Sequence, residues 1–198
     1  MVFFQQGRRK AWQQLCDETG AKFAGGFWRN YPVEMKFQNW KILLDTYVTH
    51  YRYHSNTFTR MRAPFLSKEK YQFRVYNENF FTKVTKFLGA QDIEIGDSSF
   101  DDCFMIKSNN AKYTIELLSN NRIKELICSI STIDLKIVHG DSFQGEGLPM
   151  EVDALYFSVN GEIRDVEKLK KLFELFGEVL ISLVEMGIIE DLEPKVSF

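Results

Sequence analysis

The sequence predicts an α+β protein, and the order of its segments indicates this class. The first third is dominated by strand-like segments in which apolar and polar residues alternate, as in VEMKF (33–37). Strands and helices are mixed after that, and the last long segment (164–186) has apolar residues at helical spacing. We therefore expect an N-terminal antiparallel β-meander, then mixed strands and helices, with a long amphipathic C-terminal helix packed on the sheet.

Composition supports a folded, globular chain. Of its 198 residues, 44% are hydrophobic and 26% charged, which suffices for a core without metal or disulfide support. The net charge of −2 gives no bulk electrostatic reason to expect nucleic acid as a partner. We expect one compact domain over 1–198. A subdivision at Pro64 and the charged run 67–70 would separate a β-rich part (1–65) from an α+β part (66–198).

The cysteine pattern and the absence of targeting signals suggest a cytoplasmic protein. Cys16, Cys103 and Cys128 are odd in number and match no zinc-binding spacing, so we expect reduced thiols and no metal or cofactor. The apolar run at 1–4 is too short for a signal peptide. No stretch is apolar over the length that a membrane helix needs, so no membrane insertion is expected.

The individual elements follow from periodicity and from turn and cap residues. Gly20 would end a first helix, and Asn109 or Asn110 and Asn121 would cap two short helices. The expected helices are 8–19, 78–88, 111–118, 122–130 and 164–186. The expected strands are 22–28, 33–37, 40–49, 57–65, 71–76, 131–138 and 154–159, with a turn within 50–56 and a glycine-containing loop at 139–153.

The segment LGAQDIEIGDSSFDDCFMIKSNN (88–110) concentrates acidic residues. Period-two alternation places Asp92 and Glu94 on one face of a strand and the isoleucines between and after them on the other. We expect a hairpin with exposed acids. The alternative is a metal-dependent hydrolase or nuclease in which Asp92 and Glu94 share a site with a distant partner. The spacing does not fit a helix–loop–helix calcium site.

The segment HYRYHSNTFTRMR (50–62) interleaves basic and aromatic residues. This composition suits a phosphate backbone with stacked bases, or a single carboxylate or phosphate group. The candidate anion-binding residues are His50, Arg52, His54, Arg60 and Arg62. The alternative is a polar turn followed by one wet face of a sheet, which we prefer because the chain as a whole is acidic.

Other chemical motifs are weak. The glycine cluster GDSFQGEG (140–147) matches no phosphate-binding loop. The three histidines form no HExxH motif, and a nucleophilic pair of Cys103 with His139 has no local pattern to support it.

The last helix offers a possible interface. Its apolar residues would ordinarily cover a sheet, but Leu169, Phe176 and Leu183 also repeat every seven residues. A homodimer seam could therefore form from Leu169, Leu172, Phe176 and Leu183, and a sheet edge is a second route to a dimer.

Three segments together resemble an uncharacterised family of bacterial proteins. They are FTRMRAPF, FRVYNENFFTKVTKFLGAQDIEIGDSSFDDCFMIK and DALYFSVNGEIRDVEKLKKLFELF, and the resemblance spans roughly residues 10–186. It implies a bacterial domain of unknown function and carries over no catalytic residue.

These observations favour a non-catalytic interaction or regulatory module whose partner is another protein or a second copy of itself. A metal-dependent hydrolase or nuclease using 92–102 is the first alternative. A nucleic-acid or polyanion binder using 50–62 is the second, although we expect no nucleic acid as a partner.

Overall fold

The computed structural model describes residues 2–24, 32–51, 54–77, 91–140 and 152–194. These residues form one nine-stranded sheet of order β1-β2-β3-β4-β9-β8-β5-β7-β6, in which every neighbouring pair is antiparallel. The predicted α+β class is confirmed, as is the meander, because β1 to β4 are consecutive both in the chain and in the sheet.

The bounds of the elements are as follows. The strands are β1 (Lys22–Phe23), β2 (Val33–Phe37), β3 (Trp40–Tyr51), β4 (His54–Phe65), β5 (Phe73–Asn77), β6 (Gln91–Asp92), β7 (Phe104–Ser108), β8 (Asp134–Val138) and β9 (Asp153–Asn160). The helices are α1 (Val2–Thr19), α2 (Ser98–Asp101), α3 (Ala111–Leu118), α4 (Asn121–Ser129) and α5 (Val166–Glu185).

Several predicted bounds change. The first helix begins at Val2 instead of residue 8. The chain reverses within 50–56 as predicted, but the flanking strands are longer than expected, since β3 continues to Tyr51 and β4 begins at His54. The strand expected from 131 begins at Asp134. The expected helix 78–88 and most of the loop 139–153 lie outside the described residues. Across the proposed boundary at Pro64, β4 pairs directly with β9, so both parts of the chain contribute to one sheet.

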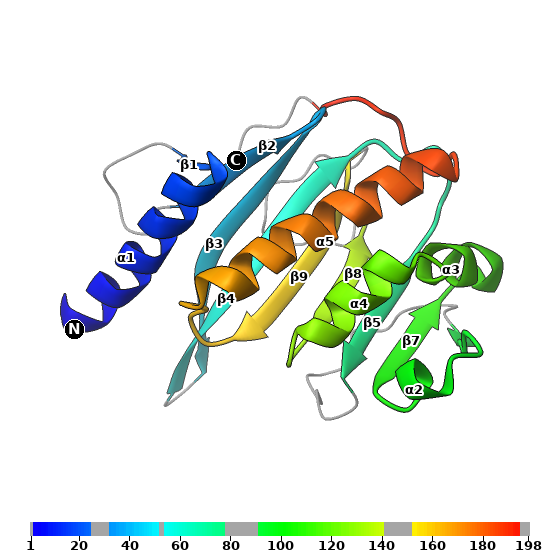
Figure 1. The fold of residues 1–198 in the computed structure, drawn as a ribbon, viewed down its shortest axis with the longest axis horizontal. Helices are drawn as coiled ribbons and strands as arrows, with labels where there is room; N and C mark the ends of the chain where they lie inside the picture. The colour runs from blue at the N-terminus through cyan, green and yellow to red at the C-terminus, as the bar shows by residue number, and fades with distance from the viewer. Residues whose placement is uncertain (1, 25–31, 52–53, 78–90, 141–151, 195–198) are drawn as a thin grey trace.

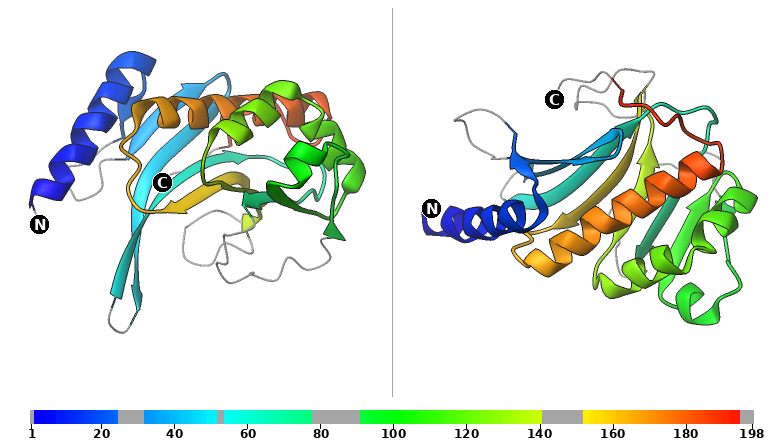
Figure 2. Two further views of the ribbon diagram at one scale, coloured as in Figure 1. Left: turned by 60° about the horizontal axis from the view of Figure 1, so that its bottom comes forward. Right: turned by 45° about the horizontal axis from the view of Figure 1, so that its top comes forward.

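The helices α1, α4 and α5 lie on one face of the sheet (Figures 1 and 2). The core fills the space between, and its fully buried aromatic side chains include Trp12 of α1, Phe73 of β5, Phe157 of β9 and Phe173 of α5. Because side chains alternate along a strand, each strand that contributes to this core directs its other residues to the opposite face.

The C-terminal helix α5 begins at a capping residue, and its apolar side is buried against the sheet. Asp165 caps its first turn by accepting a hydrogen bond of 3.1 Å from the Lys168 backbone N–H. Its apolar stripe faces the sheet, so the side chains predicted to form a dimer seam are 0% exposed within a single chain. The predicted interface of Leu169, Leu172, Phe176 and Leu183 is therefore wrong, because the chain's own sheet already covers these residues.

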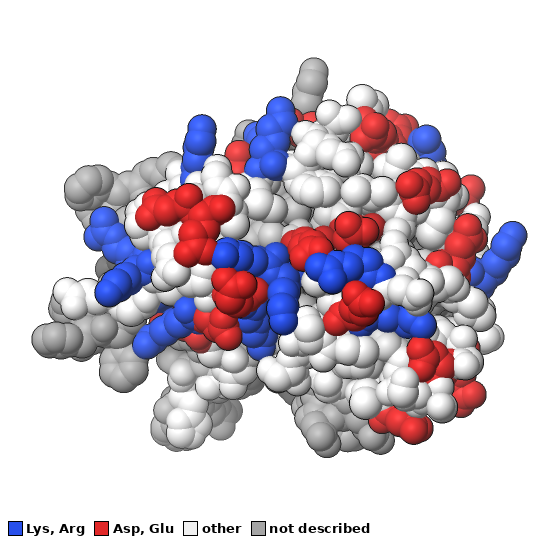
Figure 3. Space-filling model, viewed as in Figure 1, with Lys and Arg blue, Asp and Glu red and all other residues white. Residues whose placement is uncertain are grey.

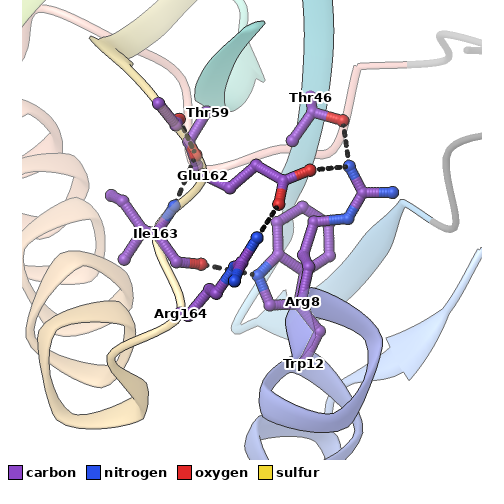
Figure 4. Close-up of polar contacts among 8 residues, drawn as sticks. Arg8, Trp12, Thr46, Thr59, Glu162, Ile163 and Arg164 are labelled. Carbon is purple, nitrogen blue, oxygen red and sulfur yellow. Dashed lines mark hydrogen bonds and ion pairs between the residues drawn. The ribbon is translucent and has the colours of Figure 1, made fainter. Parts of the chain in front are cut away.

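Helix α1 is fastened to the sheet by polar contacts at the turn between β9 and α5 (Figure 4). The buried guanidinium of Arg8 donates to Thr46 of β3 at 2.7 Å and to Glu162 at 3.1 Å, and Arg164 donates to the same carboxylate at 2.9 Å. The Trp12 indole donates to the Ile163 carbonyl at 3.1 Å. Gly20, at φ 75°, ends the helix as predicted.

Acidic and basic side chains are interspersed over the helical side of the molecule (Figure 3). Several belong to ion pairs between elements: Lys170 of α5 contacts Glu18 of α1, and Arg122 of α4 contacts Glu174 of α5 at 2.5 Å. No helix of the described residues has the length and apolarity to cross a membrane.

Candidate functional site: the charged face of the sheet

The face of the sheet opposite the helices carries charged side chains at its centre. In β4, β8, β9 and β5, residues that face the core alternate with Arg60, Arg62, Lys136, Tyr156 and Arg74. All but Lys136, which is half-buried, are less than 10% exposed. Charged groups are seldom buried unless they are paired or functional, so this face is the candidate site.

The strand register aligns four of these side chains and Lys107 of β7 in one row across five strands. In order, Arg62 lies opposite Tyr156, Tyr156 opposite Lys136, Lys136 opposite Arg74, and Arg74 opposite Lys107 of β7. We call Arg62, Tyr156, Lys136, Arg74 and Lys107 the cationic row. It contains two successive pairs of directly opposed like charges, an arrangement that destabilises a sheet.

Three aspartates bond to the cations of this face. Asp45 accepts two hydrogen bonds from Arg60 and one from Arg62, each of 2.7 Å. The other two contact the remaining cations of the row. Asp134 accepts from Arg74 at 2.6 and 3.1 Å and lies 3.7 Å from Lys136, while Asp92 lies 3.1 Å from Lys107. Among the described residues, Arg60 and the four cations of the row thus contact these three carboxylates.

Tyrosine rings lie beside the cations. Arg60 is 5.0 Å from the centroid of Tyr47, Arg74 is 4.5 Å from that of Tyr76, and Lys136 is 5.1 Å from that of Tyr156. The negative faces of these rings favour the charged form of each cation. The rings also fix the rotamers of long side chains, which preorganises the row.

Burial shifts the ionisation of the row. It lowers the pKa of Lys136, and the nearby Arg74 lowers it further while Asp134 opposes the shift. Burial also lowers the pKa of Arg62 and raises that of the Tyr156 phenol, which stays protonated as a hydrogen-bond donor near neutral pH. A negatively charged group next to Lys136 would restore the pKa of its ammonium group toward the ordinary value.

The acidic segment forms the predicted antiparallel pair but no convergent site. Asp92 and Glu94 are exposed, as predicted, and Ile93 and Ile95 are half-buried against the core. The pairing with β7 covers only the two residues of β6, and the connection between the two strands contains the helix α2. Asp101 accepts from the Ile95 and Gly96 backbone N–H groups at 3.1 and 3.0 Å, so it organises the loop.

A hollow of about 410 Å³ lies beside this segment, lined by residues that include Asp92, Glu94, Asp101 and Asp102. No group of three His, Cys, Asp or Glu side chains in the described residues is arranged to hold a metal ion.

The described basic residues of 50–62 do not lie together on one surface. Arg60 and Arg62 are buried beside Asp45, whereas His50 and His54 are exposed at the far end of the same hairpin, where His50 Nδ1 lies 2.9 Å from Ser55. Arg52 lies outside the described residues. Among the described residues, the two arginines therefore lie apart from the two histidines, because most of the length of β4 separates them.

His139 contacts a carboxylate and not a cysteine. Its Nδ1 lies 2.8 Å from Asp153, whose second oxygen accepts a short hydrogen bond from Ser67. The aspartate thus stands between the serine and the histidine, an order that cannot activate the hydroxyl as a nucleophile. Cys103 is exposed before β7. The structure does not bring it together with His139 in any contact that we observe.

Sequence reasoning missed Arg74, Asp134, Lys136 and Tyr156 as members of a site. In the sequence, Asp134 and Lys136 alternate with Ile133, Leu135 and Ile137, and the structure buries these three apolar residues in the core. The available signal was that β4, β5, β8 and β9 each carry a cation or tyrosine on the face away from the core.

Comparisons with known proteins identify the fold alone. No family model matches the sequence, and no curated protein matches it. One solved structure is similar, the crystal structure of the mycobacterial trehalose monomycolate transport factor A, with a TM-score of 0.50 and 7% sequence identity. The alignment covers 96% of this chain and 98% of that one, so the likeness extends over the whole architecture.

Proposed function

We propose that this chain is a non-catalytic binding module that recognises an anionic group on the charged face of its sheet. The observation that carries the proposal is the cationic row, in which Lys136 and Arg74, and then Arg74 and Lys107, lie directly opposite each other. Each such like-charge pair costs stability. An anion bound along the row would offset that cost in the bound state.

The ligand would approach the row at its lysines. The side chains of Lys107 and Lys136 are 24% and 17% exposed, whereas that of Arg74 is only 4% exposed. The ammonium groups are therefore the accessible donors, with Arg74 acting beneath them. Ammonium and guanidinium groups bind phosphate and carboxylate through charge-assisted hydrogen bonds, which defines the chemical class of the ligand.

A binding role fits the row better than catalysis. Asp45, Asp134 and Asp92 each contact an arginine or lysine of this face. The row therefore presents hydrogen-bond donors and positive charge, which hold an anion but do not abstract a proton. The fold is also that of a protein named as a transport factor, which is consistent with a carrier or interaction role.

The proposal includes a cytoplasmic location in a bacterium and a protein, or a second copy of the chain, as the partner. Cys16, Cys103 and Cys128 form no disulfide, which fits a reducing compartment.

Thermal unfolding with defined anions tests the binding site. Inorganic phosphate, pyrophosphate and succinate, each compared with sodium chloride at equal ionic strength, separate phosphate from carboxylate recognition. We expect one of these anions to raise Tm by several degrees, because a ligand at 100 times its Kd adds about 2.7 kcal/mol. A mixed-sequence oligonucleotide at about 150 mM salt should give no shift, since few phosphate contacts bind weakly there.

Substitution of the row distinguishes a functional role from a structural one. In Lys136→Met the half-buried ammonium is replaced by an apolar side chain of similar length, so Tm without ligand should stay unchanged or rise while the anion-induced shift disappears. Lys171→Met, at an exposed position of α5, is the matched control and should keep the shift. Equal anion-induced shifts in Lys136→Met and in the unmodified chain would refute the proposal, as would no shift with any anion.

A further inference from the structure

Two of the three cysteines are exposed and lie in one region of the molecule. Cys103 stands between the end of α2 and the start of β7, and Cys128 stands near the end of α4. The third, Cys16, is buried in the core. Two neighbouring exposed thiols have a chemistry that a single thiol lacks, because an oxidant can join them as a disulfide.

An ion pair holds α4 against the turn that contains α2. The ammonium group of Lys124 donates to Asp97, the residue before α2, at 2.8 Å. Residues four apart in a helix lie on the same side, so Cys128 follows Lys124 along the side of α4 that faces this turn. Cys103 belongs to the same turn, because its backbone N–H donates to the Phe100 carbonyl at 3.0 Å. The two thiols therefore lie at the same boundary between α4 and the turn.

The ionisation of Cys128 reflects this neighbourhood. Partial burial raises the pKa of the Cys128 thiol, Cys103 raises it further, and Asp97 adds a smaller increase. Lys124 opposes the shift. Because the interaction between charges falls with distance, an effect of Cys103 that exceeds that of Asp97 indicates that the two sulfur atoms are close. The raised pKa also keeps Cys128 protonated near neutral pH, so it is the less reactive member of the pair.

Packed residues hold the backbone at both cysteines. Cys103 lies between Phe100 and the buried Phe104, and the centroids of these two rings are 4.7 Å apart. Ile127, the residue before Cys128, is 0% exposed. The neighbours are thus anchored in the core while both sulfur atoms remain at the surface. A reagent in solution can reach both thiols without opening the core.

We propose that Cys103 and Cys128 are a redox-active pair, which a small-molecule disulfide of the glutathione type converts into an intramolecular disulfide. The thiolate of Cys103 attacks one sulfur of the reagent, so that a mixed disulfide forms, the reagent's S–S bond breaks and one thiolate leaves. The sulfur of Cys128 loses its proton and attacks the Cys103 sulfur, which forms the new S–S bond and releases the second thiolate. The two cysteines lose two electrons, the reagent gains them, and the two cysteine protons end on its two thiols.

The disulfide would fasten the outer strands of the sheet to the helical layer. Strand β7 pairs over five residues with β5, but on its other side only the two residues of β6 pair with it. A covalent bond from the residue before β7 to α4 would restrict the opening of this end of the sheet. The described chain is in the reduced state, in which this restriction is absent. The pair acts independently of the anion site proposed above.

Incubation of the folded full chain in buffers of reduced and oxidised glutathione tests the proposal. Mass mapping under non-reducing conditions should find the peptides of Cys103 and Cys128 joined and two hydrogen atoms lighter, with Cys16 still a free thiol. The joined form should unfold at a Tm several degrees higher, because the bond constrains the unfolded chain. Hydrogen exchange should become slower in α4 and β7 and stay unchanged in β2 and β3. Excess dithiothreitol should reverse all three changes.

Serine variants provide the matched controls. Cys103→Ser and Cys128→Ser each keep one exposed thiol, so each should stop at the mixed disulfide with glutathione and show no gain in Tm from an intramolecular bond. Circular dichroism establishes that both variants are folded. Mixed disulfides at both cysteines of the unmodified chain, without a bond between them, would overturn the proposal. A bond that forms only in urea would overturn it as well, because the folded chain would then not bring the two thiols together.

Discussion

Arg60 and Asp45 lie directly opposite each other on β4 and β3, joined by two parallel hydrogen bonds of 2.7 Å. Arg62 donates a third bond to the same carboxylate, so one buried negative charge serves two buried guanidinium groups. Such a cluster is worth less for net stability than its bond count suggests, because burial removes three charges from water. Breaking it is nevertheless costly, because the remaining charges stay buried.

Asp45→Asn should therefore lower the free energy of unfolding by about 3–5 kcal/mol, as expected for removal of one partner from a buried ion pair. Urea unfolding followed by tryptophan fluorescence measures the change. Asp92→Asn is the control, because the Asp92 side chain is 67% exposed beside Lys107 and its loss should cost at most about 1 kcal/mol. Similar losses in the two variants would show that Asp45 is not the counter-charge of this cluster.

The contrast between Asp45 and Asp92 shows what sequence patterns could and could not predict. Period-two alternation correctly placed the two sides of β2, and helical spacing correctly identified α5. Alternation says which residues share a face, but not whether that face is covered. Burial of Arg62, for example, depends on strands β3 and β9, which the chain reaches before and long after it.

The pairing of strands that lie far apart in the sequence could not be predicted from the sequence either. Strand β5 pairs with β7 on one side and β8 on the other, and β4 pairs with β9, some ninety positions later in the chain. Nothing in the local sequence of β5 selects these partners, because their hydrophobic patterns are alike. Local capping was predicted within one residue: Asn110 and Asn120, next to the expected Asn121, accept the hydrogen bonds that begin α3 and α4.

Gly177 in the middle of α5 packs directly against the ring of Phe37 in β2. A Cβ at this position would lie 2.6 Å from Phe37 Cζ, well inside contact distance. In an exposed helix, glycine to alanine would stabilise by about 1 kcal/mol. Here Gly177→Ala should destabilise by about 1–3 kcal/mol, because the ring or the helix must move in a packed core. Thermal unfolding measures the difference.

The partner side chain provides the control for Gly177. If the clash with the ring is the cause, Phe37→Leu should make Gly177→Ala much less harmful, which a double-mutant cycle would reveal as a coupling energy. Additive losses in the double variant would instead attribute the effect to the backbone of α5.

Glu162 connects α1 to the rest of the molecule by accepting bonds from both Arg8 and Arg164. Glu162→Gln would leave the buried Arg8 guanidinium with a weaker acceptor, so α1 should open more often while the sheet remains intact. Hydrogen exchange should therefore become about tenfold faster in α1 and stay unchanged in β8 and β9. Lys170→Met, which removes the peripheral contact with Glu18, is the control and should have a smaller effect. Uniform acceleration in all elements would show that α1 does not open separately.

Asp97 should contribute an acid-sensitive component to stability through Lys124 of α4. Hydrogen bonds from Lys124 at 2.8 Å and from Ser99 at 2.7 Å lower the pKa of Asp97 to about 2 from the ordinary 3.8. A carboxyl group with a lower pKa in the folded chain stabilises it above pH 3.8, and this contribution is lost as the pH falls toward 2.

Lys124→Met removes the first of these hydrogen bonds and should bring the pKa of Asp97 closer to its ordinary value. The urea midpoint of the variant should then fall less steeply between pH 4 and pH 2 than that of the unmodified chain, while both respond alike above pH 5. Because Asp97 is exposed, the difference should shrink as salt is added. Lys171→Met serves as the control for loss of one positive charge. Parallel curves for Lys124→Met and the unmodified chain over the whole acid range would show that Asp97 is not held in its ionised form by Lys124.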